Sequence, residues 1–145
     1  MRNFYFILLL TLFFQSCTHK LAKERRSYDG LQLIDFCDLP KYAGQKVFIK
    51  AAYSGVDEYW ALNSTTRCVQ PLNVELDDIS GKEIPKRFQK LFDSAHNSYW
   101  DTYLIVELTG VFENDSPNGY GHLGSNKARL IVKEYVSVTL AKRKK

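Results

Sequence analysis

Hydrophobic residues recur at every second position over much of the chain, which is the period of β-strands. The clearest run covers residues 47–53, in which Val47, Ile49 and Ala51 share one face. Similar runs predict four more strands, at residues 59–62, 68–76, 103–112 and 130–140. The pattern therefore predicts a mainly β protein with five strands.

One segment follows a different period. Its apolar residues recur at spacings of three and four, apart from one adjacent pair: Ile84, Phe88, Leu91, Phe92 and Ala95. This stripe is typical of an amphipathic surface helix, and Pro85 is tolerated in the first turn of such a helix. The predicted order is three strands, one helix and two long strands.

Three positions interrupt the strand pattern. Pro71 lacks an N–H group, so we expect a bulge or an edge position there. Gly110 is expected to allow a sharp bend. Glu134 falls in phase with buried residues, and a bulge near residues 133–135 would turn its carboxylate away from the core.

The first residues have the pattern of an export signal. Arg2 precedes an apolar run over residues 4–14, which is too short for a bilayer core that needs about 20 residues. The pair Ser16-Cys17 at its end resembles the lipobox of bacterial lipoproteins. The resemblance implies that Cys17 is acylated and becomes the mature N-terminus. The alternative is an ordinary secretory signal in which Cys17 is incidental.

These features divide the chain into four parts: a lipoprotein signal peptide over residues 1–16, a polar tether over 17–29, one domain over 30–141 and a basic tail over 142–145. We expect a lipid-anchored protein of the bacterial cell envelope. Because Thr18 is not acidic, we favour the outer membrane over the inner one, by the sorting rule known for some bacterial lipoproteins.

The formal charge of +4 is unevenly distributed. The domain carries 11 Lys and Arg against 14 Asp and Glu, a net charge of −3, and the remaining positive charge lies at the two ends. A nucleic-acid-binding domain is expected to carry its basic residues on the folded body. We therefore do not expect nucleic acid as a partner. The basic residues of the tether are either solvated, which we favour, or bound to anionic headgroups.

The order of elements resembles the oligonucleotide/oligosaccharide-binding (OB) fold. The stretch from Cys37 through Gly44 to Val47 is similar to the opening of small exported OB-like proteins. Residues 108–112 and 119–123 resemble their later half. The resemblance implies a five-stranded OB-like barrel with one α-helix between strands 3 and 4. Most of those proteins have no known function, so it implies no mechanism.

The cysteine count suggests a disulfide. If Cys17 carries a lipid, Cys37 and Cys68 remain as a pair, and an exported chain enters an oxidising compartment. The alternative is two buried free thiols. No cysteine or histidine spacing in the chain suggests a zinc site.

The most unusual loop covers residues 119–125. Its candidate binding residues are Gly119, Tyr120, Gly121 and His122. Glycines permit positive φ and a tight path, but a phosphate-binding loop needs a following helix, and here a strand follows. We expect the loop to close the end of the barrel, with ligand binding as the alternative.

No arrangement of residues indicates a catalytic, metal or cofactor site, and we expect no enzyme. Several aromatic residues offer a stacking surface for bases or sugars, or else fill the barrel: Phe48, Tyr53, Tyr59, Trp60 and Tyr103. The leading hypothesis is a non-catalytic envelope module that acts by binding or by structural support, with an envelope protein or glycan as partner. The alternative is an OB-type binder of oligosaccharide or nucleic acid.

Overall fold

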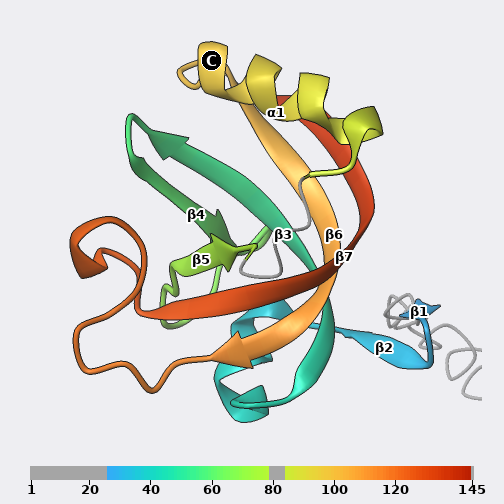
Figure 1. The fold of residues 1–145 in the computed structure, drawn as a ribbon, viewed down its shortest axis with the longest axis vertical. Coiled ribbons are helices and arrows are strands. Elements are labelled where there is room, and N and C mark those ends of the chain that lie inside the picture. The colour runs from blue at the N-terminus through green and yellow to red at the C-terminus, as the bar shows by residue number, and fades with distance from the viewer. Residues whose placement is uncertain (1–25, 79–83, 145) are drawn as a thin grey trace, which may run out of the picture.

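A closed barrel of five strands forms the centre of the molecule (Figure 1). The computed structural model describes residues 26–78 and 84–144. The barrel strands are β3 (Lys46–Val56), β4 (Tyr59–Asn63), β5 (Val74–Asp77), β6 (Thr102–Glu113) and β7 (Ala128–Lys142). Neighbours follow the order β3-β4-β5-β7-β6, and pairing of β6 with β3 closes the ring. The prediction of a mainly β protein is confirmed.

The interior of the barrel follows the predicted alternation. Val47, Ile49 and Ala51 of β3 are at most 2% exposed, and Leu104 and Val106 of β6 are fully buried. The two strands pair antiparallel from Lys46↔Val111 to Tyr53↔Leu104. Alternation places the apolar side chains of each strand on one face, which the closed barrel buries. This burial is the main contribution to the stability of the fold.

Two short strands, β1 (Ser27–Tyr28) and β2 (Leu31–Ile34), add to the outside of the barrel. They are joined by Asp29 and Gly30, which both have positive φ, as a tight two-residue turn requires. β2 pairs parallel with β3. The Tyr28 ring lies 5.8 Å from the ring of Phe48, which explains why Phe48 is buried although it faces outward.

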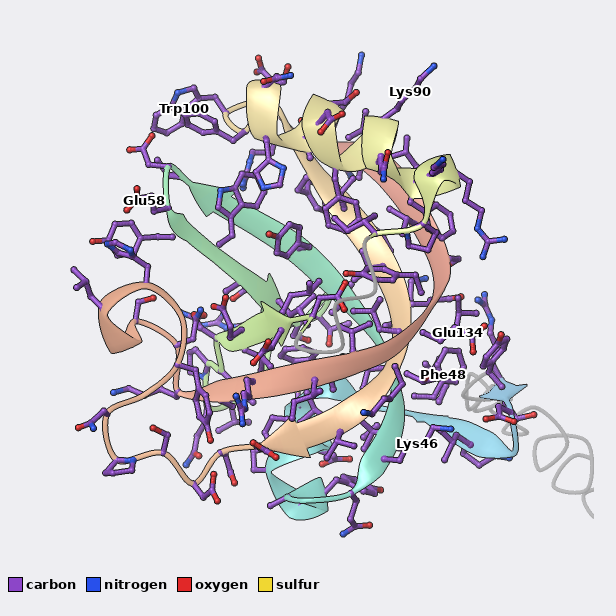
Figure 2. All side chains as sticks on the ribbon, viewed as in Figure 1. Lys46, Phe48, Glu58, Lys90, Trp100 and Glu134 are labelled. Carbon is purple, nitrogen blue, oxygen red and sulfur yellow. A yellow bond between two sulfur atoms is a disulfide. The ribbon has the colours of Figure 1, made fainter. Side chains whose placement is uncertain are left out.

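Polar contacts also hold this N-terminal arm against the barrel. Tyr28 donates a hydrogen bond to Glu134 at 2.6 Å, and Arg26 contacts Glu107 at 2.8 Å. Figure 2 shows Phe48 and Glu134 on the side of the barrel that the arm covers. Residues 26–29 belong to the segment expected as a tether. The signal peptide and Cys17 lie outside the described residues.

The helix α1 (Lys86–Asn97) crosses one end of the barrel (Figure 1). Phe92 and Ala95 of the predicted stripe are its buried residues. The helix lies between β5 and β6, so the expectation that it lies between strands 3 and 4 is wrong. The reason is that β1 and β2 precede the barrel, and their short sequences carry no period that predicts strands.

The predicted strand over residues 68–76 is also wrong in its extent, because β5 begins only at Val74. Cys68 is tied to the 3-10 helix η1 (Phe36–Tyr42), and Val69 is fully exposed. Pro71 therefore precedes the strand and forms no bulge in it. The disulfide holds this segment beside η1 and outside the sheet, a placement that the alternation of residues does not reveal.

The irregularity predicted near residues 133–135 is confirmed. The register of β6 against β7 shifts twice, so that Lys133 and Val136 have no partner in the ladder. Glu134 consequently points outward and is exposed. Gly110 lies at one of the shifts, where a Cβ atom would come within 2.6 Å of the carbonyl oxygen of Ile131.

None of the helices in the described residues is long and apolar enough to span a bilayer.

Candidate functional site

The predicted disulfide between Cys37 and Cys68 is present, with the two Cα atoms 5.5 Å apart. It joins η1 to the segment between β4 and β5. The two cysteines are 31 residues apart, and closing a loop of that length in the unfolded chain stabilises the folded state by about 3–4 kcal/mol. The bond fixes a segment that makes no strand of its own.

The glycine loop folds back on itself between β6 and β7. Gly119, Gly121 and Gly124 have φ between 69° and 72°, and Leu123 has φ of 53°. The backbone of Tyr120 pairs with that of Asn126 through hydrogen bonds of 2.9 and 3.0 Å. The loop is therefore a closed turn whose shape depends on its glycines.

The side chain of Tyr120 serves the loop itself. Its hydroxyl donates to Asp115 at 2.8 Å and accepts from the backbone N–H of Ser116 at 3.1 Å. The guanidinium of Arg129 lies over the ring at 5.2 Å. Partial burial, followed by the hydrogen bond to Asp115, raises the pKa of this hydroxyl. These contacts favour a structural role for Tyr120.

His122 joins the loop to the hairpin of β3 and β4. Its Nδ1 lies 3.2 Å from a carboxylate oxygen of Glu58, and its ring meets the edge of Tyr59 at 5.1 Å. The side chain of Glu58 is 72% exposed, so this contact contributes little stability. The turn of the β3–β4 hairpin and the glycine loop thus meet at the surface.

A buried amide, which the sequence pattern did not single out, holds the base of the loop. Asn126 is 4% exposed, and its Nδ2 donates to the carbonyl of Trp60 at 3.2 Å and to the carboxylate of Glu75. Burial raises the pKa of Glu75, the hydrogen bond from Asn126 opposes this, and Asp77 adds to the rise. The amide therefore connects β4, β5 and the start of β7.

The aromatic residues expected to offer a stacking surface do not form one continuous face. Tyr53 and Trp60 pack 5.1 Å apart beneath α1, where Trp60 also meets His96 at 4.1 Å. Burial raises the pKa of Tyr53 to about 12. Phe48 is covered by the N-terminal arm, and Tyr59 alone of the five is more than half exposed. Most of this set consequently fills and covers the barrel.

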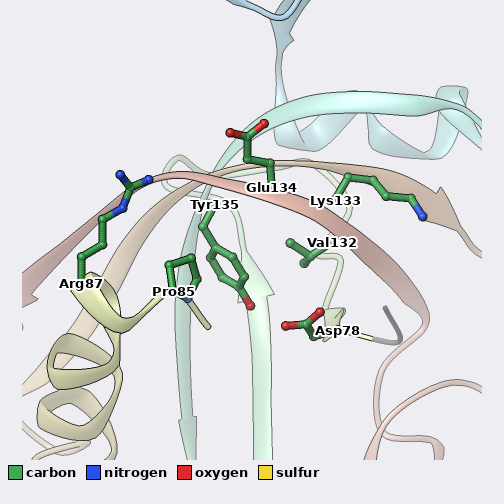
Figure 3. Close-up of a pocket in the computed structure, with 7 residues that line it drawn as sticks. All are labelled: Asp78, Pro85, Arg87, Val132, Lys133, Glu134 and Tyr135. Atoms are coloured by element: carbon green, nitrogen blue, oxygen red, sulfur yellow. The ribbon is translucent and has the colours of Figure 1, made fainter. Parts of the chain in front are cut away.

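A pocket of about 580 Å³ lies between the start of α1 and the bulged part of β7 (Figure 3). Its lining residues come from three elements or their ends: Asp78, Pro85, Arg87, Val132, Lys133, Glu134 and Tyr135. One indirect signal for this site is present in the sequence, the irregularity expected at residues 133–135. That pattern predicts an exposed Glu134 but does not by itself indicate a pocket.

Tyr135 is the most unusual residue of the pocket. The residue is 4% exposed, and its hydroxyl has no hydrogen-bond partner among the residues that the structure describes. An unsatisfied buried polar group costs about 1–3 kcal/mol, so such groups are rare in folded proteins. Burial, and then the charge of Asp78, raises the pKa of this hydroxyl. In Figure 3 the hydroxyl points toward the Asp78 carboxylate.

Within residues 26–78 and 84–144, no group of three or more His, Cys, Asp or Glu side chains is placed to hold a metal ion. The strongest ionic cluster pairs Arg129 with Glu113 at 2.7 Å and with Asp77 at 3.1 Å, across β7, β6 and β5.

Comparison with known proteins gives no significant match to a protein-family model, to a curated protein or to a solved structure.

Proposed function

We propose that this protein is a lipid-anchored, non-catalytic OB-like module of the bacterial envelope that binds or supports another envelope component. The observation that carries the proposal is the disulfide between Cys37 and Cys68. Disulfides persist in oxidising compartments and are rare in the cytosol. The bond therefore agrees with the export signal that ends at Cys17.

The arrangement of the barrel supports the OB-like part of the proposal. In OB proteins, the loop between the first two barrel strands and the loop between the last two border the ligand face. Here the corresponding segments are the β3–β4 hairpin and the loop over residues 119–125, and they meet through His122 and Glu58. The barrel alone does not define the function, because one fold hosts many functions.

The anchor would keep the barrel close to the membrane. The nine peptide units from Cys17 to Arg26 span at most about 32 Å when fully extended. The arm that follows is held to the barrel by the hydrogen bond from Tyr28 to Glu134. A module bound so closely reaches partners at or near the membrane surface. We favour the outer membrane because Thr18 is not acidic.

Mass spectrometry of protein purified from membranes tests the anchor. We expect an acylated N-terminal cysteine at position 17, and a Cys17→Ala variant that loses both the lipid and the membrane association. Cys37→Ala is the matched control, because it removes a cysteine that carries no lipid. An intact Met1, or cleavage at another residue, would refute the anchor.

A second candidate function is binding of an oligosaccharide, and the pocket beside Tyr135 favours it. A buried hydroxyl without a partner is a group that a ligand can satisfy. The net charge of −3 on the domain disfavours the nucleic acid that OB proteins also bind. Crosslinking in intact envelopes, followed by identification of the attached protein or glycan, distinguishes the binding roles.

A further inference from the structure

We infer that the pocket between α1 and the bulged part of β7 binds a saccharide that carries a carboxylate. The inference rests on the proposed function, because it assumes an envelope module with access to glycans. The volume of about 580 Å³ lies within the range of small-molecule sites, roughly 300–1,000 Å³. Polar groups and apolar walls meet in this pocket, as recognition of a sugar ring requires.

The centre of the pocket pairs a donor with an acceptor. The Tyr135 hydroxyl is buried and has no hydrogen-bond partner among the described residues, and it faces the Asp78 carboxylate (Figure 3). A sugar hydroxyl both donates and accepts, so one such group would accept from Tyr135 and donate one more hydrogen bond to Asp78. A carboxylate has lone pairs for several hydrogen bonds, so Asp78 can accept from the sugar and keep its contacts within the chain.

The walls beside these groups are apolar. Pro85 and Val132 line the same pocket and offer a surface to the C–H face of a sugar ring. The bulge creates the space, because Lys133 has no partner in the β6–β7 ladder and the strand bends there. The site is thus built by the irregular part of β7.

Positive charge is available at the rim. Arg87 and Lys133 make no ion pair with any described residue, and the guanidinium of Arg87 lies over the ring of Phe88 at 4.6 Å. Helix α1 has no side-chain cap and no acidic residue in its first turn, so its positive end is not neutralised. These features favour a carboxylate substituent on the sugar.

A bare anion fits the pocket less well. Asp78 and Glu134 line it together with the two cations, so the charges balance. Glu134 already accepts a hydrogen bond from the hydroxyl of Tyr28. A ligand with several neutral hydroxyls and one carboxylate suits this mixed set, because its hydroxyls can donate to Asp78 while its carboxylate meets Arg87 or Lys133. A phosphate ion brings negative charge without such a set of hydroxyl donors.

Isothermal titration calorimetry on the mature, lipidated protein in detergent tests the inference, with trigalacturonate as the acidic probe, chitotriose as the neutral one and inorganic phosphate as the simple anion. We expect trigalacturonate to bind best. Tyr135→Phe should weaken its binding about ten-fold without lowering the melting temperature, because only an unsatisfied hydroxyl is removed. Tyr103→Phe, a tyrosine of β6 away from the pocket, should change binding less than two-fold.

Arg87→Gln supplies the second variant. It should weaken trigalacturonate and leave chitotriose unchanged. The inference is overturned if neither saccharide binds, if Tyr135→Phe binds as the natural protein does, or if phosphate binds as tightly as trigalacturonate. None of these outcomes affects lipidation of Cys17 or the envelope location, so failure of this inference is distinguishable from failure of the proposed function.

Discussion

Replacement of Gly121 by alanine tests whether the loop over residues 119–125 is a locked structural element. An added Cβ would lie 2.2 Å from a carboxylate oxygen of Glu75 and 2.9 Å from Nδ2 of Asn126. The backbone of Gly121 also has φ of 69°, which alanine adopts only with strain. The substitution therefore combines a local strain with a collision at the base of the loop.

The two effects have separable magnitudes. Gly121 has φ of 69° and ψ of −161°, a region that essentially only glycine adopts, and strain there costs about 1–3 kcal/mol for an alanine. Displacement of Glu75 breaks its hydrogen bond with the buried amide of Asn126, and an unsatisfied buried group costs about 1–3 kcal/mol. We therefore expect Gly121→Ala to lower the free energy of unfolding by about 2–6 kcal/mol in total.

Gly44→Ala is the matched control, because Gly44 has φ of 72° but no atom within 4 Å of an added Cβ. It should show the strain alone, about 1–2 kcal/mol. Urea denaturation of both variants, followed by tryptophan fluorescence, measures the difference at an unchanged m-value. If Gly121→Ala costs no more than Gly44→Ala, the contact among Gly121, Glu75 and Asn126 does not hold the loop, and the structural interpretation fails.

Three further predictions address other parts of the molecule. Replacing Cys37 and Cys68 together by alanine should destabilise the protein by about 2–5 kcal/mol, and labelling of the unreduced, denatured natural protein should find neither thiol free; two reactive thiols would contradict this. His122→Ala should lower stability by about 0.5–1.5 kcal/mol through the lost contact with the β3–β4 hairpin; unchanged melting with loss of an envelope partner in a pull-down would instead make the loop a binding site. Because the pKa of Glu75 is raised on folding, its contribution to stability is largest at low pH and falls as the pH rises through that pKa. Denaturation between pH 4 and 7 should show this fall for the natural protein and not for Glu75→Gln; an equal pH dependence would refute it.

Much of the fold follows from local patterns in the sequence. Alternation placed Val47, Ile49 and Ala51 inside the barrel, and a helical stripe placed Phe92 in the core. The phase of Glu134 among buried positions is enough to indicate an irregular strand. These inferences hold because periods of 2 and 3.6 residues depend only on the backbone geometry of strands and helices.

Other features depend on residues that are far apart in the chain. Tyr28 and Glu134 are separated by 106 residues, and their hydrogen bond helps place β1 on the barrel. Cys68 is bonded to η1, and residues 68–73 lie outside the expected third strand. No local period encodes such contacts, so the alternation predicts neither β1 nor the true start of β5.

The candidate sites divide in the same way. Residue type and spacing are enough to identify the unusual glycine loop, the even pair Cys37 and Cys68, and the export pattern. The contact of Gly121 with Glu75, and the burial of the Tyr135 hydroxyl without a partner among the described residues, follow only from the packing of the folded chain. Burial and hydrogen-bond satisfaction are properties of the packed environment, and that environment is assembled from β5, α1 and β7 only when the barrel closes.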